Sequence, residues 1–185
     1  ATVVSGSGFA DKSTNASIRF WDLATTRCKR VISPLEAQVE KLAVPPDGRC
    51  LVVGTWDNRV RLLEFGSGAE LRAFTPHRSP KEQRGICLSP DGRRCAVGHG
   101  DGTVKVIDLA NGRCVDCRGH LAHVRRLSFS ADGRWLATAS DDYSLRLWDP
   151  RTGRLIAASF YRAWVTAVAF LGASYRVAIG FSNGT

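Results

Sequence analysis

Short runs of alternating apolar and polar residues, separated by turn residues, recur along the chain. The clearest group lies between residues 124 and 159, with β-branched and aromatic runs at 124–129, 135–140, 145–148 and 154–159. Alternation with a period of two predicts half-buried strands. The Asp-Gly pair at 132–133 supplies the positive-φ residues of a tight hairpin turn. We therefore predict four consecutive antiparallel strands in this group.

The same group repeats along the chain at a nearly constant spacing. Asp-Gly pairs at 47–48, 91–92 and 132–133 are 44 and 41 residues apart. A second series of Asn or Asp has matching spacings of 42, 44, 41 and 41 residues, at Asn15, Asp57, Asp101, Asp142 and Asn183. Six residues after the first four of these stand Trp21, Leu63, Ile107 and Trp148. Four strands in about 41 residues is the repeat of a β-propeller blade.

The repeat divides the chain into one all-β propeller segment of five units. The first and last units are incomplete, and the boundaries that we predict are a partial blade at 1–32, blades at 33–75, 76–118 and 119–159, and a partial blade at 160–185. Fourth strands are expected at 28–32, 70–74, 113–117 and 154–159.

The fourth unit resembles a complete repeat of the WD-repeat family. The residues that carry the resemblance are Gly119-His120, the run 129–133, the run 136–140, Asp142 and the run 145–149 that ends in Trp148-Asp149. The other units look like degenerate versions, so the resemblance covers essentially the whole chain. It implies a fragment of a seven-bladed ring with four-stranded antiparallel blades. At about 41 residues per blade such a ring needs about 290 residues, so we expect two to three further blades outside this segment.

The resemblance also implies a hydrogen-bonded tetrad inside a good repeat. The matching residues are His120, Ser140 (or Thr138, on the same strand face), Asp142 and Trp148. Only the fourth unit has all four, since Ile107 and Leu63 replace the tryptophan in the third and second units. We expect those units to rest on apolar packing more than on a buried polar network.

Composition and charge narrow the class of protein. Of 185 residues, 44% are apolar and 23% charged, which is typical of a globular protein. The most apolar region, 155–181, is interrupted by Arg162 and Arg176, which leave 13 residues between them, too few to span a membrane. The six cysteines are too sparse for a disulfide scaffold. We expect free thiols in the cytoplasm, with the nucleus as the alternative.

The net charge of +9 admits an acidic partner. Most of the 21 arginines are spread over turns and strands, and the one local concentration is the loop 77–84, which contains Arg78 and Lys81. A basic surface that binds nucleic acid, phosphoinositide or acidic peptides is therefore the alternative function.

Metal and catalytic chemistry are poorly supported by the residue pattern. Cys114, Cys117, His120 and His123 have a spacing that invites a zinc site. An odd separation on one strand, however, points the two cysteines to opposite faces. His99 lies in a Gly-rich turn followed by a strand rather than a helix, and no Ser or Cys is placed beside it. We predict no cofactor, no metal and no catalytic residues.

What remains is a non-enzymatic scaffold for protein–protein interaction, within a larger multidomain protein. The family resemblance implies that partners dock on the top-face loops, which join strand four to the next strand one and strand two to strand three. Tryptophan is enriched in binding hot spots, and an enlarged loop in the first unit adds an aromatic anchor. The candidate partner-binding residues are Trp56, Trp164, Asp141, His123, Phe9, Arg78 and Lys81. The oligomeric state is left open.

Overall fold

The computed structural model describes residues 2–7, 16–35, 37–45, 47–55, 57–76, 83–172 and 175–184. In this part of the chain all regular structure is β-strand. The chain divides into two compact units, one of residues 1–44 and 48–80, the other of residues 45–47 and 81–185. The all-β fold predicted from the two-residue period is confirmed.

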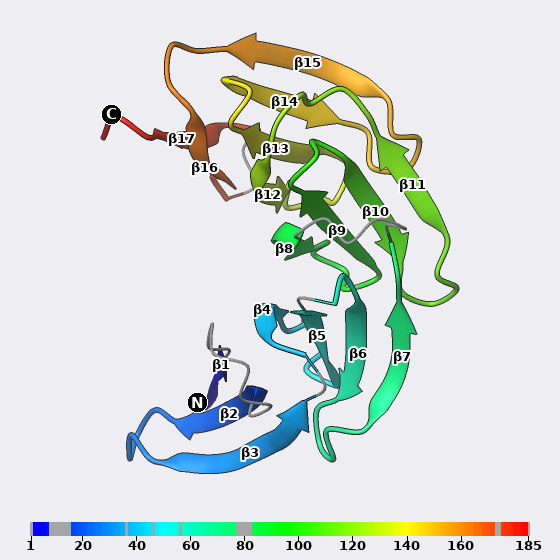
Figure 1. Cartoon of the computed structure of the whole chain (residues 1–185), viewed down its shortest axis with the longest axis vertical. Coiled ribbons are helices and arrows are strands. Elements are labelled where there is room, and N and C mark those ends of the chain that lie inside the picture. The colour runs from blue at the N-terminus through cyan, green and yellow to red at the C-terminus, as the bar shows by residue number, and fades with distance from the viewer. Residues whose placement is uncertain are drawn as a thin grey trace. The chain divides into compact units, whose positions relative to one another are not determined.

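The first unit contains two antiparallel sheets whose strands neighbour each other in chain order (Figure 1). The strands of sheet 1 are β1 (Thr2–Ser7), β2 (Ala16–Asp22) and β3 (Cys28–Leu35). Those of sheet 2 are β4 (Val39–Ala43), β5 (Cys50–Thr55), β6 (Val60–Glu64) and β7 (Glu70–Phe74).

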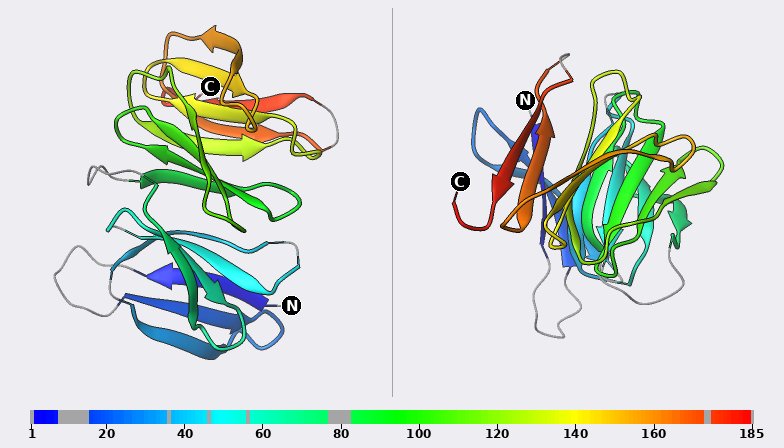
Figure 2. Two further views of the ribbon diagram at one scale, coloured as in Figure 1. Left: turned by 90° about the vertical axis from the view of Figure 1, so that its right-hand side faces the viewer. Right: turned by 90° about the horizontal axis from the view of Figure 1, so that it is seen from above.

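The second unit contains two four-stranded sheets and one two-stranded sheet. Sheet 3 consists of β8 (Gln83–Leu88), β9 (Arg94–His99), β10 (Val104–Asp108) and β11 (Cys114–Cys117). Sheet 4 consists of β12 (Val124–Phe129), β13 (Leu136–Ser140), β14 (Ser144–Trp148) and β15 (Leu155–Phe160). Sheet 5 pairs β16 (Val165–Phe170) with β17 (Val177–Phe181), orange to red in Figure 2, and β16 packs against β12 and β13. The predicted four-stranded antiparallel blade is thus present.

Two outer strands run past the predicted boundaries. β3 continues to Leu35, which pairs with Ala16, although the first blade was expected to end at residue 32. β15 continues to Phe160, which pairs with Ser144. In both places the third strand still offers a pairing partner, so the ladder extends into the connection.

Each unit has a core built from residues that alternate along the strands. In the first unit Ile18, Phe20, Leu51, Val53 and Leu63 form one buried cluster. In the second unit the cluster joins sheets 3 and 4, with members from Ala96 and Val104 to Leu136 and Trp148. Burial of apolar surface of this kind contributes about 25 cal/mol per Å², so contacts between neighbouring sheets stabilise each unit.

In sheets 2 to 5 the first strand contains a β-bulge near its start. The register shifts between Val39 and Lys41, Gln83 and Gly85, Val124 and Arg126, and Val165 and Ala167. The residues left over by these shifts are Glu40, Arg84, Arg125 and Thr166. A bulge leaves one residue out of the ladder and redirects its side chain.

The turn between the second and third strands has a left-handed residue at one fixed position. Asn58, Gly102, Tyr143 and Gly184 all have φ between 63° and 88°. This conformation is easy for Gly and tolerable for Asn, but it is uncommon for a bulky residue such as tyrosine.

Candidate functional site

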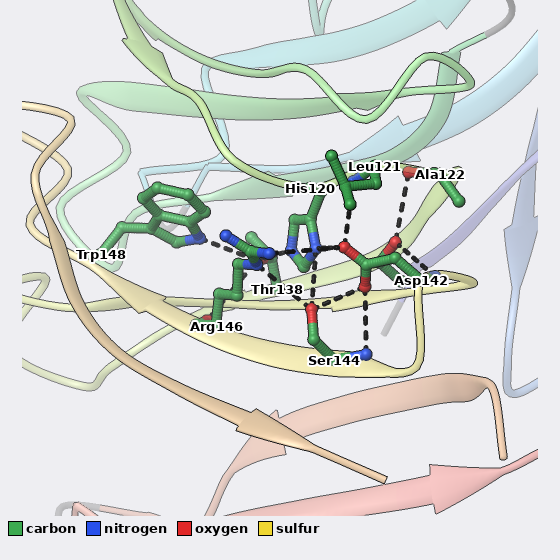
Figure 3. A network of polar contacts seen from close by, with 9 residues as sticks. His120, Leu121, Ala122, Thr138, Asp142, Ser144, Arg146 and Trp148 are labelled. Atoms are coloured by element: carbon green, nitrogen blue, oxygen red, sulfur yellow. Dashed lines mark hydrogen bonds and ion pairs between the residues drawn. The ribbon is translucent and has the colours of Figure 1, made fainter. Parts of the chain in front are cut away.

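A network of buried hydrogen bonds links β13, β14, the turn between them and the connection that precedes β12 (Figure 3). The Trp148 indole N–H donates to Thr138 Oγ1 at 2.8 Å, and Thr138 Oγ1 lies 2.7 Å from His120 Nε2. His120 Nδ1 lies 2.8 Å from Asp142 Oδ2. Because an ionised Asp142 accepts hydrogen bonds only, His120 carries its proton on Nδ1 and accepts the Thr138 hydroxyl at Nε2.

The hydroxyl in this hydrogen-bond network belongs to Thr138. This corrects the sequence prediction, which placed Ser140 first and Thr138 as the alternative. Trp148 pairs directly with Leu136, so its indole reaches the diagonal neighbour two residues along β13, which is Thr138. Ser140 lies two residues further on, accepts from the Asp142 backbone N–H and donates to the Ala122 carbonyl. Ser140 therefore fastens the turn rather than bridging histidine and tryptophan.

The charge states inside the network follow from burial and from its donors. Hydrogen bonds from Ser144, His120 and the Leu121 N–H outweigh desolvation and lower the pKa of Asp142 to about 2. Burial lowers the pKa of His120 below its usual value, an effect only partly offset by Asp142. Near neutral pH the pair is therefore a neutral imidazole that donates to a carboxylate, which is a structural arrangement.

Beside this network lies the top face of the second unit, formed by the turns 100–103 and 141–143 and by the connections 118–123 and 161–164. Its centre is a two-pronged ion pair between Arg125 and Asp141, in which Arg125 Nη2 lies 2.7 Å from Asp141 Oδ2. The hydrogen bonds that Arg125 donates to the Asp141 carboxylate raise the pKa of Arg125 further. The Arg125 guanidinium carbon stands 5.9 Å from the centre of the Trp164 ring.

The structure brings three of the predicted partner-binding residues together around Arg125. Trp164 is 44% exposed, and the His123 side chain is 45% exposed with Nδ1 3.6 Å from Asp141 Oδ2. The Asp141 side chain is only 13% exposed, because Arg125 covers it. The remaining predicted residues, Phe9, Trp56, Arg78 and Lys81, lie outside the described residues.

Sequence reasoning missed Arg125, Tyr143 and Leu121 on this face. The sequence shows Arg125 only as one of many arginines spread over turns and strands, but its bulge position directs its side chain across the turn to Asp141. Tyr143 is 47% exposed on a left-handed backbone, and Leu121 is 86% exposed beside it. The sequence could have indicated Tyr143 by its position, since Tyr143 directly follows Asp142, the repeating turn aspartate.

The cysteines and histidines of the candidate zinc motif do not come together around one point. Cys114 is exposed and Cys117 is buried, as an odd separation on one strand requires. Burial raises the pKa of the Cys117 thiol to about 12, which disfavours the thiolate that zinc needs. In the described ranges no group of three or more His, Cys, Asp or Glu side chains could hold a metal ion.

In the same described ranges the structure contains no helix that is long and apolar enough to span a membrane.

Relatives with established names match this chain over parts of their length. It is 32% identical over 150 residues to the WD repeat-containing protein SL1-17 of Schistosoma mansoni, which covers 81% of this chain and 49% of that protein. It is 31% identical over 135 residues, 73% of this chain and 30% of the relative, to the target of rapamycin complex subunit wat1 of Schizosaccharomyces pombe. The nuclear distribution protein PAC1 of Coccidioides posadasii is 30% identical over 79% of this chain and 35% of its own length. The chain thus spans half or less of these relatives.

A repeat model described as "WD domain, G-beta repeat" matches residues 27–63, 68–108 and 112–149, together more than half of the chain. The second match begins just before β7, the fourth strand of sheet 2, and ends with β10, the third strand of sheet 3. The third match begins just before β11, the fourth strand of sheet 3, and ends directly after Trp148 in β14, the third strand of sheet 4. The match, the antiparallel four-stranded sheets and the buried hydrogen bonds from Trp148 through Thr138 and His120 to Asp142 all indicate the same repeat. The chain belongs to the WD-repeat family.

Proposed function

We propose that the chain is a non-enzymatic scaffold that binds protein partners through the top face of its second unit. WD repeats, and relatives named as subunits of a complex, indicate a protein-interaction scaffold. The relatives are longer than this chain, so the activity and partners of the whole protein belong to the same proposal, as does a cytoplasmic location.

The observation that carries the proposal is the exposed Trp164 beside an internally neutralised ion pair. Arg125 and Asp141 satisfy each other, so a partner that covers them need not supply a counter-charge. Trp164 offers a large apolar surface at low cost in side-chain entropy. An aromatic side chain over a guanidinium is a rigid platform on which another protein's apolar side chain can rest.

The backbone strain at Tyr143 supports the same face. A non-glycine residue in the left-handed region costs about 1–2 kcal/mol, yet the turn holds a tyrosine there with its ring half exposed. Leu121 is tied next to it, since its N–H donates to Asp142 Oδ2 at 3.0 Å. Asp142 thus anchors the backbone at Leu121 and directly precedes Tyr143 in the turn.

A pull-down from cell extract with the full protein tests this function. We expect Trp164→Ala to abolish binding of the main partners, because truncation of a hot-spot residue costs about 2 kcal/mol or more. We expect wild-type binding to survive high salt, because the contact is apolar and the Arg125–Asp141 pair is already neutralised. The matched control is Leu171→Ala, an exposed apolar residue at the other end of sheet 5. Partners that tolerate Trp164→Ala but dissociate in salt would contradict the proposal and favour the basic-surface alternative.

A further inference from the structure

The opposite end of sheet 4 holds a small cavity lined by Arg134, Trp135, Asp149 and Arg151, with a volume of about 150 Å³. It belongs to the bottom face of the second unit, formed by the hairpins 89–94 and 130–135 and the turns 109–113 and 149–154. Leu136 pairs with Trp148, so the next residues outward, Trp135 and Asp149, are also neighbours. The pairing of β13 with β14 therefore brings the two arginines to one place.

The two guanidinium groups at this cavity interact with neighbouring carboxylates through charge alone, since Arg134 helps to lower the pKa of Asp132 and Arg151 that of Asp149. Among the residues that the structure describes, neither the Arg134 nor the Arg151 side chain takes part in a hydrogen bond or ion pair. The basic side chains of the top half of sheets 3 and 4 differ. Four of them face a carboxylate, in the pairs Lys105–Asp116, Arg118–Asp116, Arg125–Asp141 and Arg146–Asp142.

The nearby carboxylates are already engaged in holding their own turns. Asp132 accepts from Ser130 Oγ at 2.7 Å, from the Arg134 N–H at 3.0 Å and from the Tyr175 hydroxyl at 3.0 Å. Asp149 accepts from the Arg151 N–H at 2.9 Å. Of the two, only Asp149 lines the cavity, so the lining carries two positive charges and one negative charge.

Trp135 supplies an apolar wall and a free donor. Its backbone is fixed by Ser130, which accepts the Trp135 N–H at 2.9 Å. Within the described part of the chain its indole N–H makes no hydrogen bond, and the side chain is half buried. A cavity lined by an indole and two guanidinium groups suits a ligand with a short apolar stem and an anionic tip.

We propose that this cavity binds a carboxylate side chain of an acidic peptide segment. Guanidinium groups bind carboxylates through paired, charge-assisted hydrogen bonds. A single carboxylate balances the surplus positive charge of the lining, whereas a dianionic phosphate would overshoot it. The cavity is far smaller than the roughly 300–1,000 Å³ of small-molecule pockets, so it admits one side chain rather than a whole ligand. The site lies on a different face from Trp164 and does not depend on the proposed top-face function.

Sheet 3 lacks this arrangement although it has the same turns. Arg93 and Arg94 occupy the positions of Arg134 and Trp135, and Ala110 occupies that of Arg151. Arg94 is turned toward sheet 4, where it donates to the Gly133 carbonyl at 3.0 Å. Arg93 is thus an exposed arginine at the same loop position without a second arginine opposite it, which makes it the matched control.

Fluorescence anisotropy with the full chain tests the site, with a fluorescein-labelled peptide of alternating Glu and Gly as the probe. We expect Arg134→Ala/Arg151→Ala to weaken binding about tenfold or more, because the variant loses the charge-assisted hydrogen bonds of both guanidinium groups to the carboxylate. Arg93→Ala should stay within about twofold. Arg134→Lys/Arg151→Lys keeps the charge but loses the planar fork, so most of the loss should remain.

A local signal identifies the place of binding. The indole N–H resonance of Trp135, assigned with Trp135→Phe, should shift on titration with the Glu peptide and not with the same peptide carrying Gln. The proposal is overturned if the Glu peptide does not bind, if Arg93→Ala costs as much as the double alanine variant, or if the Trp135 resonance stays unmoved. It is also overturned if a labelled single-stranded DNA 10-mer binds more tightly and loses as much in the double variant, because the site would then be a nucleic-acid contact.

Discussion

Sheets 3 and 4 share one backbone design but fill the same two buried positions differently. In sheet 4 these positions hold Thr138 and Trp148, which are joined by a hydrogen bond. In sheet 3 they hold Val97 and Ile107, both fully buried. Ile107 pairs with Cys95 as Trp148 pairs with Leu136, so the registers correspond.

The difference teaches that the hydroxyl and the indole are exchanged together. Replacing both partners of a buried hydrogen bond by apolar groups is nearly neutral, whereas removing one leaves a polar atom unsatisfied. Sheet 2 follows the same rule with Val53 and Leu63. Each of these sheets therefore holds either a hydroxyl with an indole or two apolar side chains. A sheet that combined one member of each pair should be less stable.

The largest effect is expected from Trp148→Ala. This change removes a fully buried aromatic side chain from the core between sheets 3 and 4 and leaves Thr138 without its donor, at a cost of about 3–5 kcal/mol. Urea unfolding measures the loss. The matched change Ile107→Ala removes a smaller side chain and no hydrogen bond, so an equal or larger loss there would refute the view that sheet 4 depends more on its network.

A smaller loss is expected from Thr138→Val, which introduces the side chain found in sheet 3. The Trp148 N–H and His120 Nε2 would both lose a partner in a buried place, at a cost of about 1–3 kcal/mol. Urea unfolding again gives the value. Ser140→Ala is the control, because it removes a hydroxyl that takes no part in the Trp148–Thr138–His120–Asp142 hydrogen bonds. The reverse change, Val97→Thr, should destabilise sheet 3, because it buries a hydroxyl where sheet 3 has no indole. A neutral Thr138→Val would show that the network contributes nothing net.

Acid should act on sheet 4 in two steps. The pKa of His120 is lower in the folded state than in the unfolded state, so the unfolded state binds the proton first, and stability falls as the pH drops below about 6.5. The pKa of Asp142 is about 2, below its ordinary value of 3.8, so its contribution of about 1–2 kcal/mol is complete above pH 4 and is lost as the pH falls through 2. Thermal melts between pH 7.5 and 2 measure both steps. Asp142→Asn should abolish the lower one, and its persistence would assign that step to other carboxylates.

The smallest effect is expected at the turn, where Tyr143 and Gly102 occupy the same left-handed position. Tyr143→Gly should stabilise the chain slightly, by up to about 1 kcal/mol, because the backbone strain is relieved. Gly102→Ala should destabilise it, because a Cβ there would lie 2.4 Å from the His120 carbonyl oxygen. Thermal melts of the two variants should move in opposite directions. If Tyr143→Gly also weakens partner binding, the strain at this turn serves recognition.

The repeat, its strands and its turns could be predicted because they depend on local signals. Alternating residues and Asp-Gly pairs act within a few positions, and they located the strands from Cys50–Thr55 to Leu155–Phe160 within a few residues. Thr138 and Ser140 could not be separated by alternation alone, since both point to one face of β13. Only the pairing of Trp148 with Leu136 decides between them.

The candidate surface was predicted less completely than the strands. His123, Asp141 and Trp164 were identified from their positions beside turns, but the residue that joins them, Arg125, depends on a bulge. A bulge arises from the fit between two strands rather than from the residues at the site. Likewise, Arg134 and Arg151 are 17 positions apart and meet only through strand pairing.

The repeated bulge gives this architecture a way to change its specificity without changing its shape. Four residues of three different kinds, Glu40, Arg84, Arg125 and Thr166, occupy one backbone position that lies outside the ladder. Because no pairing bond depends on the identity of the side chain there, selection can rewrite each position independently while the sheets are inherited unchanged. A library randomised at these four residues should therefore fold in most of its members and differ in what it binds.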